Sequence, residues 1–398
     1  MSGAQPWTML VMATIGFAVS FWAWALLSPL GPRFADILHL SSFSQALVVA
    51  VPVIVGSLGR IPVGALTDRF GGRVMMPLVC LATIVPVLYL GLSGRTSLPG
   101  LLVGGFFLGL GGTSFAVGVP FVNAWFPPDR RGLAIGIFGM GMGGTAIAAL
   151  TTVRLVNANG MASPFVITAI VLAVYSVIAY FVMRDAPGRV VPSDSVATRL
   201  VSTCKLKVTW QAAALYAVAF GGYVAFSVYL PTDLRNAYRL GQGDASNRMA
   251  GFVLLAVIMR PVGGWLADRL GPARILAVSL AVAIIGAIIE SFTPSLNPVG
   301  TIAFLLMAAA LGAGSGAVFS LVAKVAPATA VGSVTGVVGA AGGLGGFIPP
   351  LIMGYVYGQF HTYRAGMLAL AFIAALALVL TLTAVRRGLT HLQRHYVS

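Results

Sequence analysis

The chain has 398 residues, of which 58% are hydrophobic and only 8% are charged, and its formal net charge is +15. A mean hydropathy of +0.96 is typical of a polytopic membrane protein and excludes a soluble globular domain. The excess of basic over acidic residues does not indicate a nucleic-acid partner, because basic residues that border membrane spans bind anionic lipid.

Twelve apolar stretches follow one another along the chain, each close to the ~20 residues that a helix needs to cross a bilayer. They lie near residues 8–28, 43–62, 74–93, 99–122, 132–153, 163–183, 210–231, 246–266, 273–292, 299–322, 330–352 and 365–385. Backbone groups in hydrocarbon must be satisfied within the segment, so spans of this length predict helices and exclude a β-barrel. The first stretch lacks a basic n-region and a small-residue cleavage site, which indicates a retained helix and not a signal peptide.

The basic residues predict how these spans are oriented. With both termini in the cytoplasm, fifteen of the 24 Lys and Arg residues lie on the cytoplasmic side and seven on the other. This asymmetry follows the positive-inside rule. We therefore expect a multi-pass protein of the cell inner membrane with both termini cytoplasmic.

Arg60 and Arg260 remain inside apolar runs that contain no acidic residue. An arginine fork can bind two oxygens of one anion through charge-assisted hydrogen bonds, so a small anion is the partner that these cations favour. The alternative is a pair of helix-end arginines that reach back to water. Each lies roughly two turns, ~10 Å, inside its cytoplasmic loop, which favours the anion site.

An internal repeat relates the two arginines. Segment 60–71 returns at 260–271, and the positions that recur after 200 residues include Arg60, Gly64, Leu66, Asp68, Arg69 and Gly71, followed by Pro127, Gly136, Gly139 and Gly143. The repeat predicts an N-terminal six-helix bundle at 1–185, a cytoplasmic linker at 186–208 and a C-terminal six-helix bundle at 209–398. Parallel repeats of this kind place a substrate site near mid-membrane and alternate its access by rocking one half against the other.

Segment 64–73, Gly-Ala-Leu-Thr-Asp-Arg-Phe-Gly-Gly-Arg, and its echo at 264–271 resemble the loop signature of the major facilitator superfamily. The resemblance implies an all-α membrane protein with 12 transmembrane helices in two pseudo-symmetric six-helix bundles. It also implies a cytoplasmic latch that holds the outward-facing state, formed here by Asp68, Arg69, Arg73, Asp268 and Arg269. A turn that only ends a helix is the alternative interpretation of these residues.

A second resemblance is narrower. Residues 111–118, followed by Trp125-Phe126-Pro127 and Arg131-Gly132, are similar to the signature of the nitrate/nitrite porters. The resemblance implies nitrate and nitrite as substrates, and a binding site formed by Arg60, Arg260, Phe115, Phe220 and Tyr216, in which flat aromatic rings pack against a planar anion. Met142 departs from the family, since many members carry asparagine there.

The glycine-rich runs 139–144 and 339–347 resemble the fifth and eleventh helices of the same family. Their glycines are Gly139, Gly141, Gly143, Gly144, Gly342, Gly343, Gly345 and Gly346. A residue without a side chain lets helix backbones approach, slide or bend, as a gate requires. Simple close packing explains these glycines equally well.

The placement of acidic residues bears on energy coupling. With the spans placed as above, Asp233 is expected in a loop or at a helix end, and Glu290 at the far end of the ninth helix. A proton-coupled carrier usually needs a titratable group within the membrane, and arginine stays protonated. The leading hypothesis is therefore exchange of nitrate for nitrite by alternating access. The alternatives are a proton-coupled nitrate symporter that uses Glu290 or water, a carrier of another small anion, and a non-transporting receptor.

No clustered nucleophile, base or metal ligand indicates an enzyme, a cofactor or a metal site. Cys80 falls in a span and Cys204 in the linker, so no disulfide is expected. We expect a monomer whose partners are nitrate, nitrite and the lipid bilayer.

Overall fold

The computed structural model describes residues 4–127, 131–187, 196–326 and 331–385. Within these ranges the chain is almost entirely helical and contains no strand. Twelve helical segments are long and apolar enough to cross a membrane. The predicted all-α class with 12 spans is confirmed.

The first six spans contain several breaks. They are α1 (Ala4–Trp24) with α2 (Leu27–Leu38); α3 (Ser42–Ala50), α4 (Pro52–Leu58) and α5 (Arg60–Phe70); α6 (Gly72–Leu92); α7 (Leu98–Leu108), the turn η2 (Gly109–Thr113) and α8 (Ser114–Trp125); α9 (Arg131–Gly139), the turn η3 (Met140–Gly143) and α10 (Gly144–Asn159); and α11 (Ser163–Val182). The first span continues past its predicted end at residue 28. Pro29 lies in the first turn of α2, where its missing N–H is tolerated.

The last six spans contain fewer breaks. They are α13 (Lys207–Tyr238); α14 (Gln242–Leu270); α15 (Pro272–Ser291); the turn η4 (Leu296–Gly300) with α16 (Thr301–Val325); α17 (Val331–Gly345) with α18 (Ile348–Phe360); and α19 (Arg364–Leu380) with the turn η5 (Thr381–Val385). A further helix, α12 (Val196–Cys204), precedes them within the predicted linker. Residues 188–195 of that linker lie outside the described residues.

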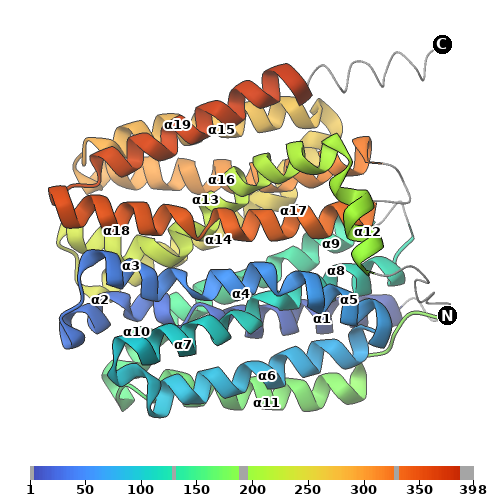
Figure 1. Ribbon diagram of the computed structural model, residues 1–398, viewed down its shortest axis with the longest axis horizontal. Coiled ribbons are helices and arrows are strands. Elements are labelled where there is room, and N and C mark those ends of the chain that lie inside the picture. Colours follow the sequence, from blue (N-terminus) through green and yellow to red (C-terminus); the bar gives the residue numbers. More distant parts are fainter. Residues whose placement is uncertain (1–3, 128–130, 188–195, 327–330, 386–398) are drawn as a thin grey trace.

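The spans lie side by side, so their connections gather at two ends of the bundle (Figure 1). We call one end the hairpin end; it carries the connections at residues 39–41, 93–97, 160–162, 239–241, 292–295 and 361–363. The linker end carries α12, Gly71 and Gly271. In Figure 1 the first six spans form the lower part and the last six the upper part, and α3 and α4 of the first half pack against α18 and α17 of the second.

Hydrogen bonds between the two halves close the hairpin end. They join Ser28 to the carbonyl oxygens of Ser227 and Val228, Gln45 to Thr232, Gln242 to the carbonyl oxygen of Pro29, Arg154 to Asn247, and Arg235 to Asp36. The Ser28 and Gln45 bonds are buried and measure 2.7–3.1 Å. They therefore hold the two halves together at this end.

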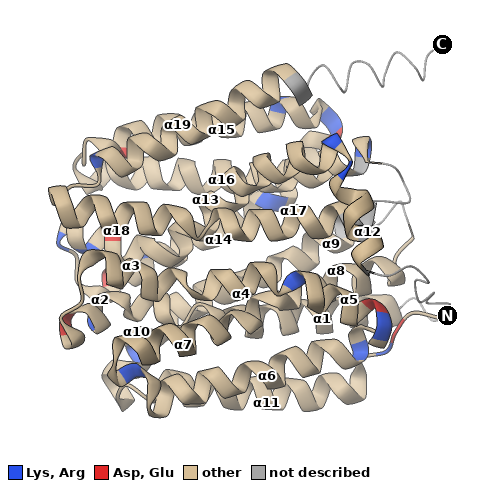
Figure 2. Ribbon diagram, in the orientation of Figure 1, with Lys and Arg blue, Asp and Glu red and all other residues tan. Residues whose placement is uncertain are grey.

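Charged residues follow the same division along the bundle. Figure 2 shows that they gather at the two ends, while a few basic segments interrupt the otherwise uncharged middle. Arg60 and Arg260 are among the buried residues, at 7% and 8% exposure. The middle of the bundle thus carries positive charge within an apolar layer.

Helix α14, which carries Arg260, touches α16 backbone to backbone. A Cβ atom placed on Gly316 would lie 2.0 Å from the carbonyl oxygen of Arg260 and 2.8 Å from the nitrogen of Gly264. These distances leave no room for a methyl group, so the two helices approach as closely as a small residue allows. The position of Arg260 depends on this contact.

We expect Gly316→Ala to lower the midpoint of thermal unfolding of the purified protein in detergent, because overpacking a filled contact typically costs ~1–3 kcal/mol. The control is Gly251→Ala on α14, where a Cβ atom meets no atom within 4 Å. Alanine exceeds glycine in helix propensity by about 1 kcal/mol, so the control should be neutral or slightly stabilising. Equal midpoints for the two variants would contradict the close contact.

Candidate functional site

Arg60 lies at the start of α5, directly after the break at Gly59. Its Nε donates to the carbonyl oxygen of Gly112 in η2 at 3.3 Å, and its Nη1 donates to the carbonyl oxygen of Gly339 in α17 at 2.7 Å. Gly112 belongs to the first half and Gly339 to the second. Arg60 therefore bridges the two halves in mid-bundle.

Arg260 lies within α14 and makes the corresponding bridge. Its Nη2 donates to the hydroxyl of Tyr216 at 2.6 Å, on α13 of the same half. Its Nη1 contacts the sulfur of Met142, in the glycine-rich turn η3 of the other half. The residue that departs from the family pattern thus contacts a site arginine directly, through a thioether, which is a weak acceptor.

Two phenylalanine rings lie between the arginines. The Phe115 ring centre is 5.0 Å from Cζ of Arg60 and 6.0 Å from Cζ of Arg260. The Phe220 ring centre is 5.9 Å and 5.3 Å from the same two atoms. Tyr216 stacks on Phe220, with ring centres 4.7 Å apart and planes within 4°. The structure therefore brings together all five residues predicted for the site, and the ring faces attract both cations.

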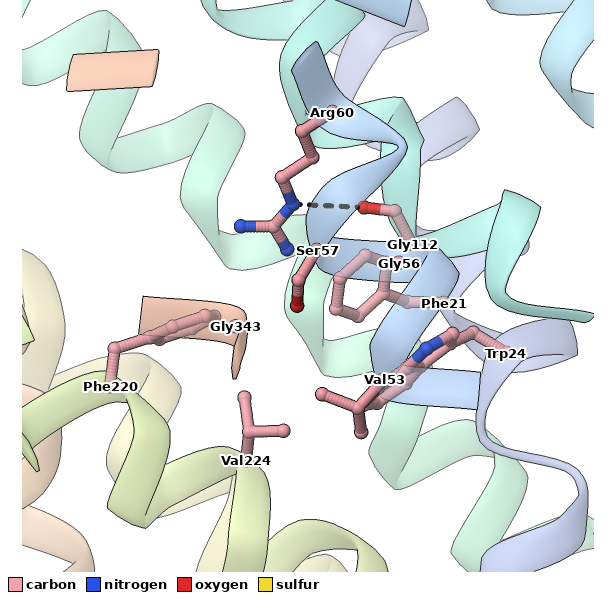
Figure 3. A pocket seen from close by; sticks show the side chains of 10 residues that line it. All are labelled: Phe21, Trp24, Val53, Gly56, Ser57, Arg60, Gly112, Phe220, Val224 and Gly343. Carbon is pink, nitrogen blue, oxygen red and sulfur yellow. Dashed lines mark hydrogen bonds between the residues drawn. The ribbon is translucent and has the colours of Figure 1, made fainter. Parts of the chain in front are cut away.

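A small cavity opens beside this cluster, with walls from both halves (Figure 3). Its lining residues are Phe21, Trp24, Val53, Gly56, Ser57, Arg60 and Gly112 from the first half and Phe220, Val224 and Gly343 from the second. The Ser57 side chain extends toward Gly343 and Phe220 across the cavity in Figure 3. Apolar walls with a few polar groups are typical of a small-ligand site.

Sequence reasoning missed two residues of this site. Phe319 on α16 places its ring centre 5.6 Å from Cζ of Arg260. Ser57 is almost fully buried at the cavity wall. A phenylalanine in a chain with 22 of them, and a serine in a transmembrane helix, give no signal that separates binding from packing.

Neither arginine has an acidic partner among the described residues. Among the described residues, no carboxylate lies within 4.0 Å of either guanidinium group. Their partners are carbonyl oxygens, a hydroxyl, a thioether and ring faces, all of which are neutral. Two buried cations that share only neutral partners form a site suited to a small anion.

The glycine-rich runs lie where the halves and helices meet. Gly139 and Gly339 face the arginines of the opposite half, since a Cβ atom would lie 3.9 Å from Nε of Arg260 in the first case and 3.8 Å from Nη1 of Arg60 in the second. The nearest atom to a hypothetical Cβ would lie only 1.9–2.7 Å away at Gly141, Gly144, Gly342, Gly343, Gly345 and Gly346, whereas Gly143 has open space. Close packing therefore accounts for six of the eight glycines.

The predicted latch residues lie at the linker end. Asp268 accepts a hydrogen bond from Ser320 at 2.6 Å and lies 4.0 Å from Nζ of Lys324, both on α16 of its own half. Arg269 stacks over the Trp265 ring at 4.2 Å, and Arg73 lies over Tyr180 at 5.8 Å. Asp68 and Arg69 occupy the last turn of α5. In this conformation the contacts of Arg73 with described residues stay within the first half. Those of Asp268 and Arg269 stay within the second half.

The expected position of Asp233 is wrong. It lies inside α13, more than one turn before the helix ends at Tyr238, and it is only 3% exposed. The predicted span stopped at Pro231, but neighbouring helices in a bundle let a transmembrane helix continue through a proline. Glu290 lies in the last turn of α15, as expected, and it is also buried.

Comparison with known proteins identifies the family. A model of the major facilitator superfamily matches residues 13–348 and 212–395. The chain belongs to this superfamily. A probable nitrate/nitrite transporter, NarK2, of Mycobacterium tuberculosis strain H37Rv is 47% identical over 94% of this chain and 95% of its own. A nitrite extrusion protein of Bacillus subtilis strain 168 is 36% identical over 98% of both chains.

These relatives confirm the narrower resemblance, so the chain is a member of the nitrate/nitrite porter family within the superfamily. Among solved structures, a bacterial homologue of the human lysosomal transporter Spinster superposes with a TM-score of 0.77 at 19% identity, over 98% of this chain and 99% of that chain. This likeness supports the major facilitator fold. The protein is therefore a multi-pass membrane transporter and not an enzyme.

Proposed function

We propose that this protein exchanges nitrate and nitrite across the cell inner membrane, with Arg60 and Arg260 as the anion-binding pair. The observation that carries the proposal is that each arginine reaches the opposite half: Arg60 bonds to Gly339, and Arg260 contacts Met142. An anion held by both guanidinium groups would therefore join the two halves at the centre of the bundle.

The chemistry of the site suits a small planar anion. Each guanidinium presents a planar fork of N–H donors that matches two oxygens of one anion. The Phe115 and Phe220 ring centres lie within 6.0 Å of Cζ of both arginines, and we expect their faces to bound a flat slot that suits a planar ion better than a tetrahedral one. The NarK2 and nitrite extrusion relatives are named for nitrate and nitrite, which have this shape.

Exchange follows from the permanent charge of the site. Closing two unpaired cations into the membrane carries a desolvation penalty of several kcal/mol per ion, and a bound anion offsets much of it. A carrier with this site therefore isomerises fastest when an anion occupies it. Coupling by exchange needs no titratable group beside the arginines, and the buried acid Asp233 lies ~20 Å along α13 from Phe220.

The proposed transport cycle requires a defined orientation in the membrane and two bundles that move relative to each other. The bundles 1–185 and 209–398 rock about the linker 186–208 as a monomer, with both termini cytoplasmic and the hairpin end outside. The latch residues Asp68, Arg69, Arg73, Asp268 and Arg269 engage when the hairpin end opens. The open positions at Gly139 and Gly143 give the gate room to shift beside Arg260, since a Cβ atom there meets at most one atom within 4 Å.

We expect Arg60→Lys and Arg260→Lys each to lower nitrate transport by more than tenfold while the protein still folds. A lysine ammonium is a point charge that cannot reproduce the two-pronged fork. Uptake of labelled nitrate into proteoliposomes measures the loss, with Arg274→Lys, an exposed residue of α15, as the matched control. Transport near the wild-type rate in either site variant would refute the two-fork site.

Phe115→Ala and Phe220→Ala should weaken nitrate binding and admit bulkier anions, because each opens the flat slot and removes a ring face from both arginines. The loss of a cation–π contact corresponds to ~0.5–2 kcal/mol, which is roughly a two- to thirtyfold weaker affinity. Titration calorimetry with nitrate and with a larger anion tests both effects. Phe107→Ala, on the exposed face of α7, is the control. Unchanged affinity and selectivity in both site variants would assign the two rings to packing.

Nitrate uptake into liposomes should require nitrate or nitrite inside, and a pH gradient alone should drive little accumulation. The measurement is counterflow of labelled nitrate into vesicles loaded with nitrite, compared with anion-free vesicles in an acidic medium. Strong uptake into the anion-free vesicles, abolished by a protonophore, would defeat exchange and support proton symport. Counterflow with an unrelated small carboxylate but not with nitrite would defeat the assignment of substrate.

A further inference from the structure

A second polar cluster lies near the hairpin end, within the second half of the molecule. Asp233 on α13 and Glu290 on α15 are each 3% exposed. Among the described residues, neither Oδ1 of Asp233 nor Oε1 of Glu290 has a hydrogen-bond partner. Both carboxyl groups therefore lie buried near the hairpin end of the second half, each with one orphaned oxygen.

Tyrosine hydroxyls surround this pair. Tyr238 donates to Oε2 of Glu290 at 2.8 Å. Asp233 interacts electrostatically with Tyr229 and Tyr363, whose hydroxyl oxygens lie 3.2 Å apart. Asp233 also lines a cavity between α13, α18 and α19, together with apolar side chains such as Phe226, Met353 and Leu370. The unpartnered carboxyl oxygen is thus buried at an apolar cavity.

No cation neutralises the pair. Of the nearby cations and titratable groups, Arg235 pairs with Asp36, Arg248 pairs with Asp244 and donates to Thr301, Arg364 lies over the Phe292 ring, Arg239 caps α13, and His361 lies beside Tyr357. Within the part of the chain that the structure describes, no basic side chain comes within 4.0 Å of either carboxylate.

We propose that Asp233 and Glu290 form a proton-binding site, and that its proton favours closure of the hairpin end. Two buried carboxylates that lack a cation cannot both stay ionised, because burial and mutual repulsion each disfavour the charged form. A bound proton removes the charge of the carboxyl that carries it and turns that carboxyl into a hydrogen-bond donor. Because the two acids have no cation partner, we expect the site to bind a proton.

The position of Asp233 links the proton to the gate. One face of α13 provides Ser227, Val228, Thr232 and Arg235 to the bonds that close the hairpin end. Asp233 follows Thr232 directly and lies one turn after Tyr229. Loss of the proton leaves two negative charges behind the gate, and water can reach them only if the end of α13 moves. Deprotonation therefore favours opening of the hairpin end.

This inference rests on the major facilitator fold and not on the proposed substrate. In an exchanger, each outward movement of an anion is matched by an inward movement through the same two conformations. The protons that this site binds and releases therefore cancel over one transport cycle. The site then changes the conformational equilibrium with pH without driving net transport. A failure of nitrate exchange would leave the proton site untouched, and the converse also holds.

The first test measures the conformation directly. Spin labels at Leu92 and Phe292, exposed positions of the two halves at the hairpin end, report the separation of the halves in a Cys80→Ser, Cys204→Ser background. We expect the distance distribution of the otherwise wild-type protein to shift to longer distances as pH rises from about 6 to 8, because release of the proton restores the buried charge. Asp233→Asn, which resembles the protonated acid, should abolish the shift.

Asp244→Asn is the matched control, because Asp244 is an exposed acid of the same end that pairs with Arg248. It should keep the wild-type shift. A pH shift that survives in Asp233→Asn would overturn the proposal. So would a shift that follows sodium concentration at constant pH, since the site would then bind a metal cation and not a proton.

Thermal unfolding in detergent provides a test that needs no labels. The native state holds a proton that the unfolded carboxyls release above about pH 5, so stability should fall as pH rises. Asp233→Asn should remove most of this fall in the unfolding midpoint, and Glu290→Gln serves if the first variant does not fold. Wild-type pH dependence in a folded Asp233→Asn or Glu290→Gln variant would contradict the proton site.

Discussion

The structure depends on two guanidinium groups that stay charged in the middle of a membrane-spanning bundle. Apolar helices can hold such groups only if neutral dipoles surround them, and here carbonyl oxygens, a tyrosine hydroxyl and ring faces do so. These partners lower the cost of burial but leave the charge in place. On the proposed function, this charge is what binds the anion and what slows passage of the anion-free carrier.

The internal repeat explains how one small ion can act on two large bundles. Arg60 bonds to Gly339, and Arg260 faces Gly139, so residues related by an offset of 200 take reciprocal positions across the interface. Each half presents an arginine to the glycine-rich helix of the other. Because a glycine exposes its carbonyl and leaves space beside the guanidinium, a shift of either half changes the surroundings of both cations together.

Sequence alone predicted the residues of the candidate site that are unusual in an apolar span. It missed those of residue types that are common in transmembrane helices. Arg60 and Arg260 stand out because an unpaired charge in an apolar run is costly, and their repeat gave the two-bundle organisation. Phe115, Phe220 and Tyr216 were predicted only through the family resemblance, and Phe319 and Ser57 were not predicted. The bond between Arg60 and Gly339 spans 279 residues, which no local pattern encodes. Asp233 was misplaced because the predicted seventh span ended at residue 231, whereas α13 continues to Tyr238.

Helix α13 joins the three functional regions of the molecule. Its 32 residues carry Tyr216 and Phe220 beside the arginines, Thr232 and Arg235 in the hairpin-end contacts, and Asp233 in the acid pair. Across ~20 Å and an effective dielectric constant of ~20, a carboxylate and a guanidinium interact by only ~0.8 kcal/mol, less than a tenfold change in affinity. The field of the acid pair is therefore too weak to control anion binding directly. Any influence of the pair on the arginines must act through movement of α13, which is continuous between them.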